Sequence, residues 1–154
     1  DAMFSASQSL GRLYLTLRGC DQTVEPLKNS CYETQFIQAM EDDFNTPKAL
    51  AVLFELSGMM NKLKEKNADE IHQYASLLTY LGQLIGLLNE DPETFLKGDS
   101  LGGKDVNKIN ELIKGRNDAR AQKNWAEADR LRDELTRMGI VLEDGETGTT
   151  WRIL

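Results

Sequence analysis

Apolar side chains recur at intervals of three and four residues over residues 69–89, the most regular pattern in the chain. The residues in this pattern are Ile71, Tyr74, Leu77, Leu78, Leu81, Leu84, Ile85 and Leu88. This spacing places them on one side of an α-helix. Because a helix must bury such a stripe against another element, the pattern predicts a helix packed within a bundle.

Three shorter apolar stripes precede this helix. The first ends near Arg18, and the second ends at the acidic cluster Glu41, Asp42 and Asp43. The third belongs to a helix that we expect to start at Pro47, with Thr46 before it capping free amides, and to fray in KLKEKN. Connections this short favour antiparallel neighbours, so residues 1–97 are predicted to form an antiparallel helical bundle, with a single turn at 91–96.

The rest of the chain has a different pattern. GDSLGGK contains three glycines and predicts a linker at residues 98–104. Apolar positions at 106–113 and 128–138 predict two more helices, and Gly139 ends the second. Residues 140–142 and 149–153 read as strands joined by a turn at 143–148. The predicted fold is therefore mainly α, with a small α+β lobe of two helices and a short β-hairpin at 105–154.

Charge is distributed unevenly between these two parts. Residues 1–103 hold 8 Lys and Arg against 15 Asp and Glu, whereas residues 104–154 hold 10 of each, so the net charge of −7 lies in the first part. Lys114, Arg116, Arg120 and Lys123 form a locally basic run. The run fits either a strip that faces phosphates or a solvated helix face.

Composition also limits the kinds of protein this chain can be. No apolar run approaches the roughly 20 residues that span a bilayer, and no signal-peptide pattern opens the chain, so we expect a soluble cytoplasmic protein without a membrane partner. Cys20, Cys31 and the lone His72 do not have the spacing of a zinc site. Because Asp1 already falls within an expected helix, we expect the chain to be part of a longer protein.

Trp125 lies on the polar side of the last expected helix. At about 100° per residue, Asp129 and Arg132 share that side, while the apolar residues Ala128, Leu131, Leu135 and Met138 cluster about a quarter turn or slightly more away. Such a side can stack on a base, accept hydrogen bonds and donate them. Trp125 could equally cover the edge of the small lobe as a structural residue. Trp151 lies on a two-stranded ribbon, and its indole is expected to face inward.

Two segments closely resemble the C-terminal region of bacterial cysteinyl-tRNA synthetases. They are DDFNTPKALAVLFEL at 42–56 and RNDARAQKNWAEADRLRDELTRMGIVLEDGETGTTWR at 116–152. The resemblance extends through SLGRLY at 9–14 and is weakest at 19–30 and 98–104. It implies a DALR-type bundle that joins a catalytic body to an anticodon-binding tail, and a monomer whose partners are cysteine tRNA and its own catalytic domain.

The tail would read the GCA anticodon. Unpaired loop bases are recognised by stacking on aromatics and by hydrogen bonds to their Watson–Crick edges. Trp125 would stack, and Asp129, in preference to Asp144, would accept the N1–H and N2–H₂ donors of guanine. Arg132, Arg120 and the backbone or hydroxyls of the two threonines would meet cytosine and adenine. The full candidate set is Arg116, Arg120, Trp125, Asp129, Arg132, Asp144, Thr149, Thr150 and Trp151.

The catalytic signatures of the family do not occur in this chain. Class I synthetases carry HIGH-type and KMSKS-type motifs, and in this family a zinc selects cysteine. We therefore expect ATP and zinc to bind in the catalytic domain of the parent ligase, and the chain alone to bind RNA without catalysis, catalytic residues, metal or cofactor. The alternatives are a protein-interaction module and a synthetase-like paralogue with another role.

Overall fold

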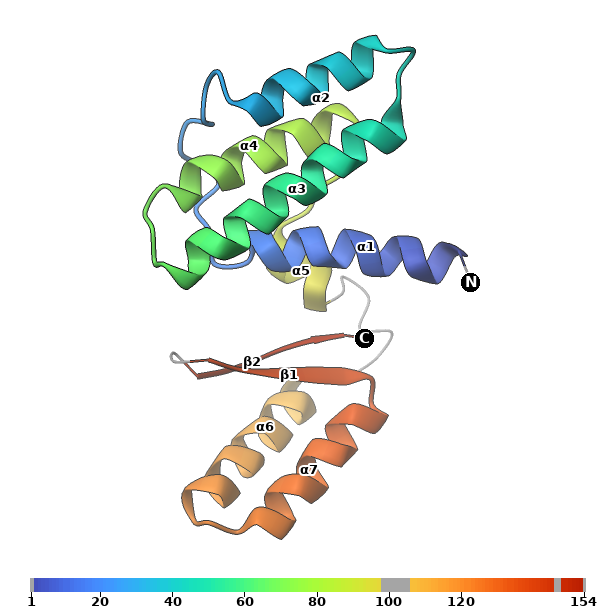
Figure 1. The fold of residues 1–154 in the computed structure, drawn as a ribbon. Helices are drawn as coiled ribbons and strands as arrows, with labels where there is room; N and C mark the ends of the chain where they lie inside the picture. The colour runs from blue at the N-terminus through green and yellow to red at the C-terminus, as the bar shows by residue number, and fades with distance from the viewer. Residues whose placement is uncertain (1, 98–105, 146–147, 154) are drawn as a thin grey trace. The chain divides into compact units, whose positions relative to one another are not determined.

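The computed structural model describes residues 2–97, 106–145 and 148–153. The chain divides into two compact units, Asp1–Phe95 and Leu96–Leu154 (Figure 1). The predicted linker at 98–104 lies outside the described residues. A mainly helical fold with one small two-stranded sheet is confirmed. Among the helices described, none combines the length and hydrophobicity needed to cross a membrane.

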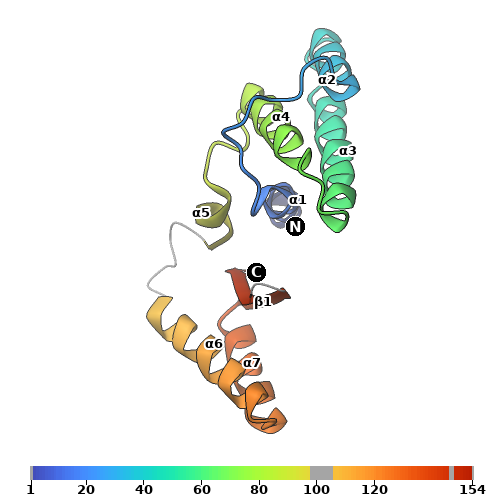
Figure 2. The same cartoon turned by 90° about the vertical axis from the view of Figure 1, so that its left-hand side faces the viewer.

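The first unit is built around a central helix. It contains α1 (Ala2–Leu17), α2 (Cys31–Glu41), α3 (Thr46–Glu65) and α4 (Ile71–Leu84), and α5 (Pro92–Lys97) follows them. Helix α3 packs against α1, α2 and α4, and consecutive helices run in opposite directions (Figures 1 and 2). The core side chains are at most 1% exposed and include Leu13, Leu17, Phe36, Leu53, Leu56, Met60, Leu77, Leu78 and Leu81. The predicted antiparallel bundle is therefore confirmed.

Helix α3 begins one residue before the expected position, and a different residue caps it. The Asn45 side chain accepts a hydrogen bond from the Lys48 amide at 3.2 Å. Thr46 is already the first helical residue, so the prediction that Thr46 caps this helix is wrong. Asparagine is among the best N-cap residues. Pro47 is accommodated in the first turn because a backbone N–H there would have no partner within the helix.

Helix α4 is shorter than its apolar stripe. It ends at Leu84, and Gly86 follows with φ +80°, a conformation that terminates helices. The chain then turns back, so that Leu88 is 2% exposed and packs over Gly82, where a Cβ would lie 2.6 Å from Leu88 Cδ1. Leu88 is thus buried outside the helix, while Leu84 is left 54% exposed.

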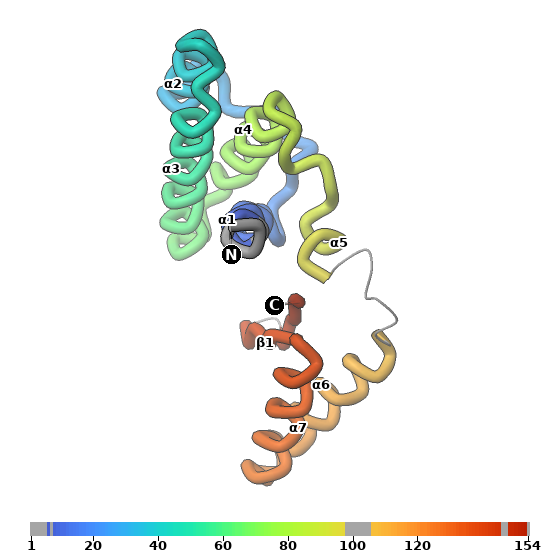
Figure 3. The backbone as a smooth tube through the Cα atoms, turned by 90° about the vertical axis from the view of Figure 1, so that its right-hand side faces the viewer, coloured from blue at the N-terminus to red at the C-terminus, as the bar shows by residue number. Residues whose placement is uncertain are grey.

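The second unit places a hairpin on a pair of helices. Helices α6 (Val106–Ala121) and α7 (Trp125–Arg137) lie side by side, and α7 leads through Gly139 into β1 (Ile140–Gly145) (Figure 3). Strand β2 (Gly148–Ile153) pairs antiparallel with β1. Both strands extend into the predicted turn at 143–148, of which residues 146–147 lie outside the described residues. The core consists of Ile109, Ile113, Leu135, Ile140 and Trp151.

Candidate nucleic-acid interface

Helix α7 begins at Trp125 because the residue before it is a helix cap. The Asn124 side chain accepts a hydrogen bond from the Glu127 amide at 3.3 Å, and the Asn124 amide donates to the carbonyl of Ala119 at 2.8 Å. Lys123 has φ +59° and makes the sharp turn out of α6. The indole therefore stands on the first residue of the helix, where it is 60% exposed.

Trp125 shares its side of α7 with two charged groups, Asp129 and Arg132. At about 100° per residue, Asp129 and Arg132 lie within a narrow sector around Trp125, and both are exposed. Neither the Asp129 carboxylate nor the Arg132 guanidinium makes a hydrogen bond or ion pair with another described residue. We call Trp125, Asp129 and Arg132 the recognition face.

Charges on the outer side of α7 neutralise one another instead. Arg130 bonds to Glu127 at 2.7 Å and to Glu134 at 3.3 Å. Its hydrogen bonds raise the pKa of Arg130 and lower that of Glu127. Such exposed pairs contribute little stability, but they occupy their own donors and acceptors. The charged groups of the recognition face have no such partners among the described residues and therefore remain available to a ligand.

Asp144, near the end of β1, binds three side chains. Arg116 donates to both of its carboxylate oxygens at 3.0 and 2.7 Å, Arg120 donates at 2.8 Å, and Thr149 donates at 2.8 Å. The hydrogen bonds from Arg116, then from Thr149, hold the pKa of Asp144 well below its usual range. Asp144 in turn raises the pKa of Arg116. This cluster fastens the hairpin to α6.

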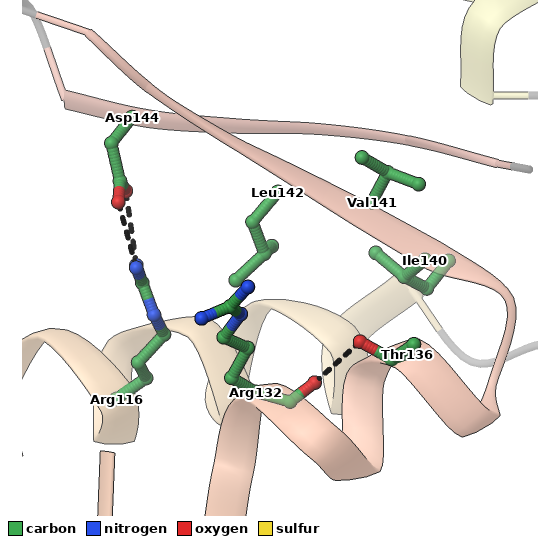
Figure 4. A pocket seen from close by; sticks show the side chains of 7 residues that line it. All are labelled: Arg116, Arg132, Thr136, Ile140, Val141, Leu142 and Asp144. Atoms are coloured by element: carbon green, nitrogen blue, oxygen red, sulfur yellow. Dashed lines mark hydrogen bonds and ion pairs between the residues drawn. The ribbon is translucent and has the colours of Figure 1, made fainter. Parts of the chain in front are cut away.

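A pocket of about 350 Å³ adjoins this cluster (Figure 4). Figure 4 shows the Arg132 guanidinium directed toward the hairpin near Leu142, beside the ion pair of Arg116 with Asp144. The Thr136 hydroxyl donates to the carbonyl of Arg132 at 2.9 Å. The pocket thus combines a guanidinium that has no ion pair in the described part of the chain with an apolar wall from β1. Its volume lies within the range of small-molecule sites, about 300–1,000 Å³.

The basic run formed by Lys114, Arg116, Arg120 and Lys123 is not continuously exposed. Arg116 is only 7% exposed, and both it and Arg120 bind Asp144. Lys114 and Lys123 are exposed. Arg116 therefore contributes to the fold of the lobe, and neither a phosphate-facing strip nor a solvated helix face describes this residue.

Two residues of the candidate set lie away from the recognition face. Trp151 is 5% exposed in the lobe core, as expected for an inward-facing indole, so its ring offers no free face to a base in this conformation. Thr150 pairs with Glu143 on the face of the hairpin opposite to Thr149 and Asp144. In this conformation Trp151 therefore supports the lobe, and Thr150 is presented on the other side.

Sequence reasoning did not identify Asn117 and Thr136. Asn117 Oδ1 lies 3.2 Å from Arg116 and 3.3 Å from the Thr149 hydroxyl, while Thr136 lines the pocket one helical turn beyond Arg132. The spacing of Thr136 from Arg132 could have indicated the second. Nothing in the sequence pairs Asn117 with the hairpin. No group of three or more potential metal-ligating side chains occurs in the described parts of the chain.

Comparison with known proteins gives two domain matches. The DALR domain family matches residues 35–89, and the family described as "Cysteinyl-tRNA ligase anticodon binding domain" matches residues 107–152. The cysteine–tRNA ligase of Glaesserella parasuis is 56% identical over 147 residues, which are 96% of this chain and 32% of that protein. The ligase of Mannheimia succiniciproducens is 55% identical over 149 residues, 97% of this chain and 32% of that protein.

The second domain match coincides with the lobe that carries the recognition face. The two units therefore define an anticodon-binding region of an aminoacyl-tRNA synthetase. More particularly, the chain belongs to the cysteine–tRNA ligase family and corresponds to its C-terminal region. It spans about a third of the length of the curated relatives that it matches.

Proposed function

We propose that this chain reads the GCA anticodon of cysteine tRNA through its recognition face. The observation that carries the proposal is the indole of Trp125, 60% exposed at the start of α7 beside Asp129 and Arg132, whose charged groups form no ion pair with a described residue. An unpaired base can lie flat on the indole while its edge meets the two charged groups. Stacking of this kind contributes about 1–3 kcal/mol per base and is tolerant of sequence.

Base specificity would come from the charged groups. A carboxylate can accept the N1–H and N2–H₂ donors of guanine together. Neither oxygen of Asp129 accepts a hydrogen bond from another described residue, whereas those of Asp144 are held by Arg116, Arg120 and Thr149. The donors of Arg132 suit the acceptors on cytosine or adenine. The structure therefore favours Asp129 over Asp144 for the first anticodon base.

The proposed parent is a monomeric cytoplasmic ligase that attaches cysteine to its tRNA. ATP and zinc would act in the part of the ligase that precedes this region, where cysteine is selected and activated. The present chain would contribute tRNA selection without chemistry of its own.

A titration of the chain with labelled anticodon stem-loops tests this function. One loop carries GCA, and three others each change a single anticodon base. We expect the GCA loop to bind most tightly. Trp125→Ala should weaken its binding by about 1–3 kcal/mol, whereas Trp125→Phe should retain most of the affinity because it keeps an aromatic plane.

Equal affinity for all four loops would contradict anticodon reading. Binding that discriminates among the loops but does not respond to Trp125→Ala would contradict the recognition face as its site.

A further inference from the structure

The bundle carries an apolar surface that its own fold leaves open. Three large apolar side chains on different elements are exposed here: Ile37 on α2 at 45%, Phe44 in the α2–α3 turn at 76%, and Leu84 at the end of α4 at 54%. All three line one pocket of about 450 Å³. We call this surface the corner patch; its residues are Phe36, Ile37, Met40, Glu41, Phe44 and Leu84.

Phe44 is displayed outward by a strained but hydrogen-bonded turn. Asp43 and Phe44 have φ of +53° and +54°, a left-handed conformation that bulky residues rarely adopt. The turn is held by hydrogen bonds from the Phe44 amide to the Met40 carbonyl at 3.2 Å and from the Asn45 amide to the Ala39 carbonyl at 3.0 Å. Glycine or asparagine would suit the position better, so folding of the bundle alone does not explain a phenylalanine here.

The edge of the corner patch is acidic. Glu41 lines the pocket, and Asp42 and Asp43 follow it along the exposed turn. Of these three carboxylates only Asp42 has an ion pair with a described residue, and its partner Lys48 is 3.9 Å away. This surface repels a phosphate backbone. It complements an apolar group that is flanked by lysine or arginine.

The size of the patch limits what can occupy it. A stable complex between separate proteins usually buries at least about 1,000 Å² in total, which three exposed side chains do not provide. A segment of the same polypeptide needs less contact area because its covalent connection gives it a high effective concentration. The matched relatives are about three times as long as this chain, so they contain such additional polypeptide.

We propose that the corner patch docks an apolar side chain flanked by basic residues, contributed by the part of the ligase polypeptide that lies outside this chain. The contact would hold the bundle at a defined position on the rest of the enzyme. This inference depends on the family assignment and not on anticodon reading, so the two can fail separately.

The test measures the solvent exposure of Phe44 in two proteins. One is the chain alone, and the other is a full-length chimaera in which the chain replaces the matching region of the Glaesserella parasuis ligase. Hydroxyl-radical footprinting should show severalfold slower oxidation of Phe44 in the chimaera. Leu84→Gln should restore fast oxidation of Phe44 there. Phe54→Gln, which changes a 37% exposed side chain outside the pocket, should not.

Equally fast oxidation of Phe44 in both proteins would overturn the proposal. Slow oxidation in the chain alone would also overturn it, and its concentration dependence would identify the occupant. Protection that disappears on dilution would indicate a second copy of the chain, whereas protection independent of concentration would indicate the chain's own C-terminal lobe. Stem-loop binding by the same samples reports separately on the proposed function.

Discussion

Two aspartates of the C-terminal lobe have the same chemistry but different environments. Asp129 is exposed and unpaired among the described residues, while Asp144 accepts hydrogen bonds from Arg116, Arg120 and Thr149. A free carboxylate can exchange water for a base edge. A carboxylate that already accepts hydrogen bonds from three side chains must first give up those bonds. Asp129 should therefore contribute mainly to binding, and Asp144 mainly to the stability of the lobe.

Matched substitutions of these aspartates should separate the two effects. Asp129→Asn should reduce the preference for guanine at the first anticodon position without changing lobe stability. Asp144→Asn should destabilise the lobe by about 1–3 kcal/mol, because it leaves the buried Arg116 without its ionic partner. Both tryptophans lie in the lobe, so tryptophan fluorescence during urea unfolding reports on this unit alone. A larger loss of stability in Asp129→Asn than in Asp144→Asn would contradict these roles.

The depressed pKa of Asp144 predicts how lobe stability depends on pH. Its stabilising effect is fully present above the unfolded-state pKa, near 3.8, and is lost as the pH falls through the lower pKa of the folded state. The urea midpoint should therefore change little through this group between about pH 7 and pH 5, and fall below about pH 4. Trp125→Phe leaves the buried Trp151 as the fluorescent reporter. In this background, Asp144→Asn should have a shallower acid-induced decline, and an identical decline would contradict the assignment.

At the scale of single elements, the start of α7 connects lobe stability to ligand recognition. Asn124 caps the helix, and Trp125 occupies the first helical residue. A helix that frays at this end releases the indole from its fixed position. The cap therefore has two measurable consequences, one on unfolding and one on RNA affinity.

Asn124→Ala should lower lobe stability by about 0.5–2 kcal/mol and weaken binding of the GCA stem-loop, while Asn124→Asp should retain both because aspartate caps equally well. Urea unfolding and stem-loop titration of the two variants provide the measurements. If Asn124→Asp weakens stem-loop binding as much as Asn124→Ala does, the side-chain amide of Asn124 itself contacts RNA and does not act through the helix.

The sequence predicted the existence and order of the major helices and both strands because apolar periodicity directly records which side of an element is buried. It did not predict where α4 ends. Leu84, Ile85 and Leu88 continue the helical spacing, but Gly86 takes a positive φ and Leu88 is buried by packing over Gly82. That contact depends on tertiary structure and overrides the local pattern.

The candidate site was predictable only in part for a similar reason. The exposed indole of Trp125 and its charged neighbours follow from spacing along one helix. The bond of Arg116 to Asp144 joins residues 28 positions apart and removes a cation from the expected basic strip. Spacing along the chain contains no information about such a pair, which depends on how the hairpin folds back onto α6.

At the scale of the whole molecule, the charge distribution limits how RNA can bind. The chain carries a net charge of −7, and the acidic excess lies in residues 1–103, whereas residues 104–154 hold equal numbers of acidic and basic side chains. In the lobe, Arg116 and Arg120 are also paired with Asp144. Affinity must therefore depend mainly on stacking and base-edge contacts, with few contributions from phosphate neutralisation.

This distribution predicts a weak dependence of RNA binding on salt. Each phosphate neutralised on a single strand contributes about −0.7 to the slope of log K against log salt concentration, so one or two contacts give a slope near −1. Titrations of the chain with the GCA stem-loop from low to moderate salt measure it. The double substitution Lys114→Gln and Lys123→Gln, at the two exposed lysines of the basic run, should flatten the slope and leave the preference for GCA unchanged. A slope steeper than about −3 would mean that phosphate contacts dominate, in which case the unpaired charges beside Trp125 would not be the main source of affinity.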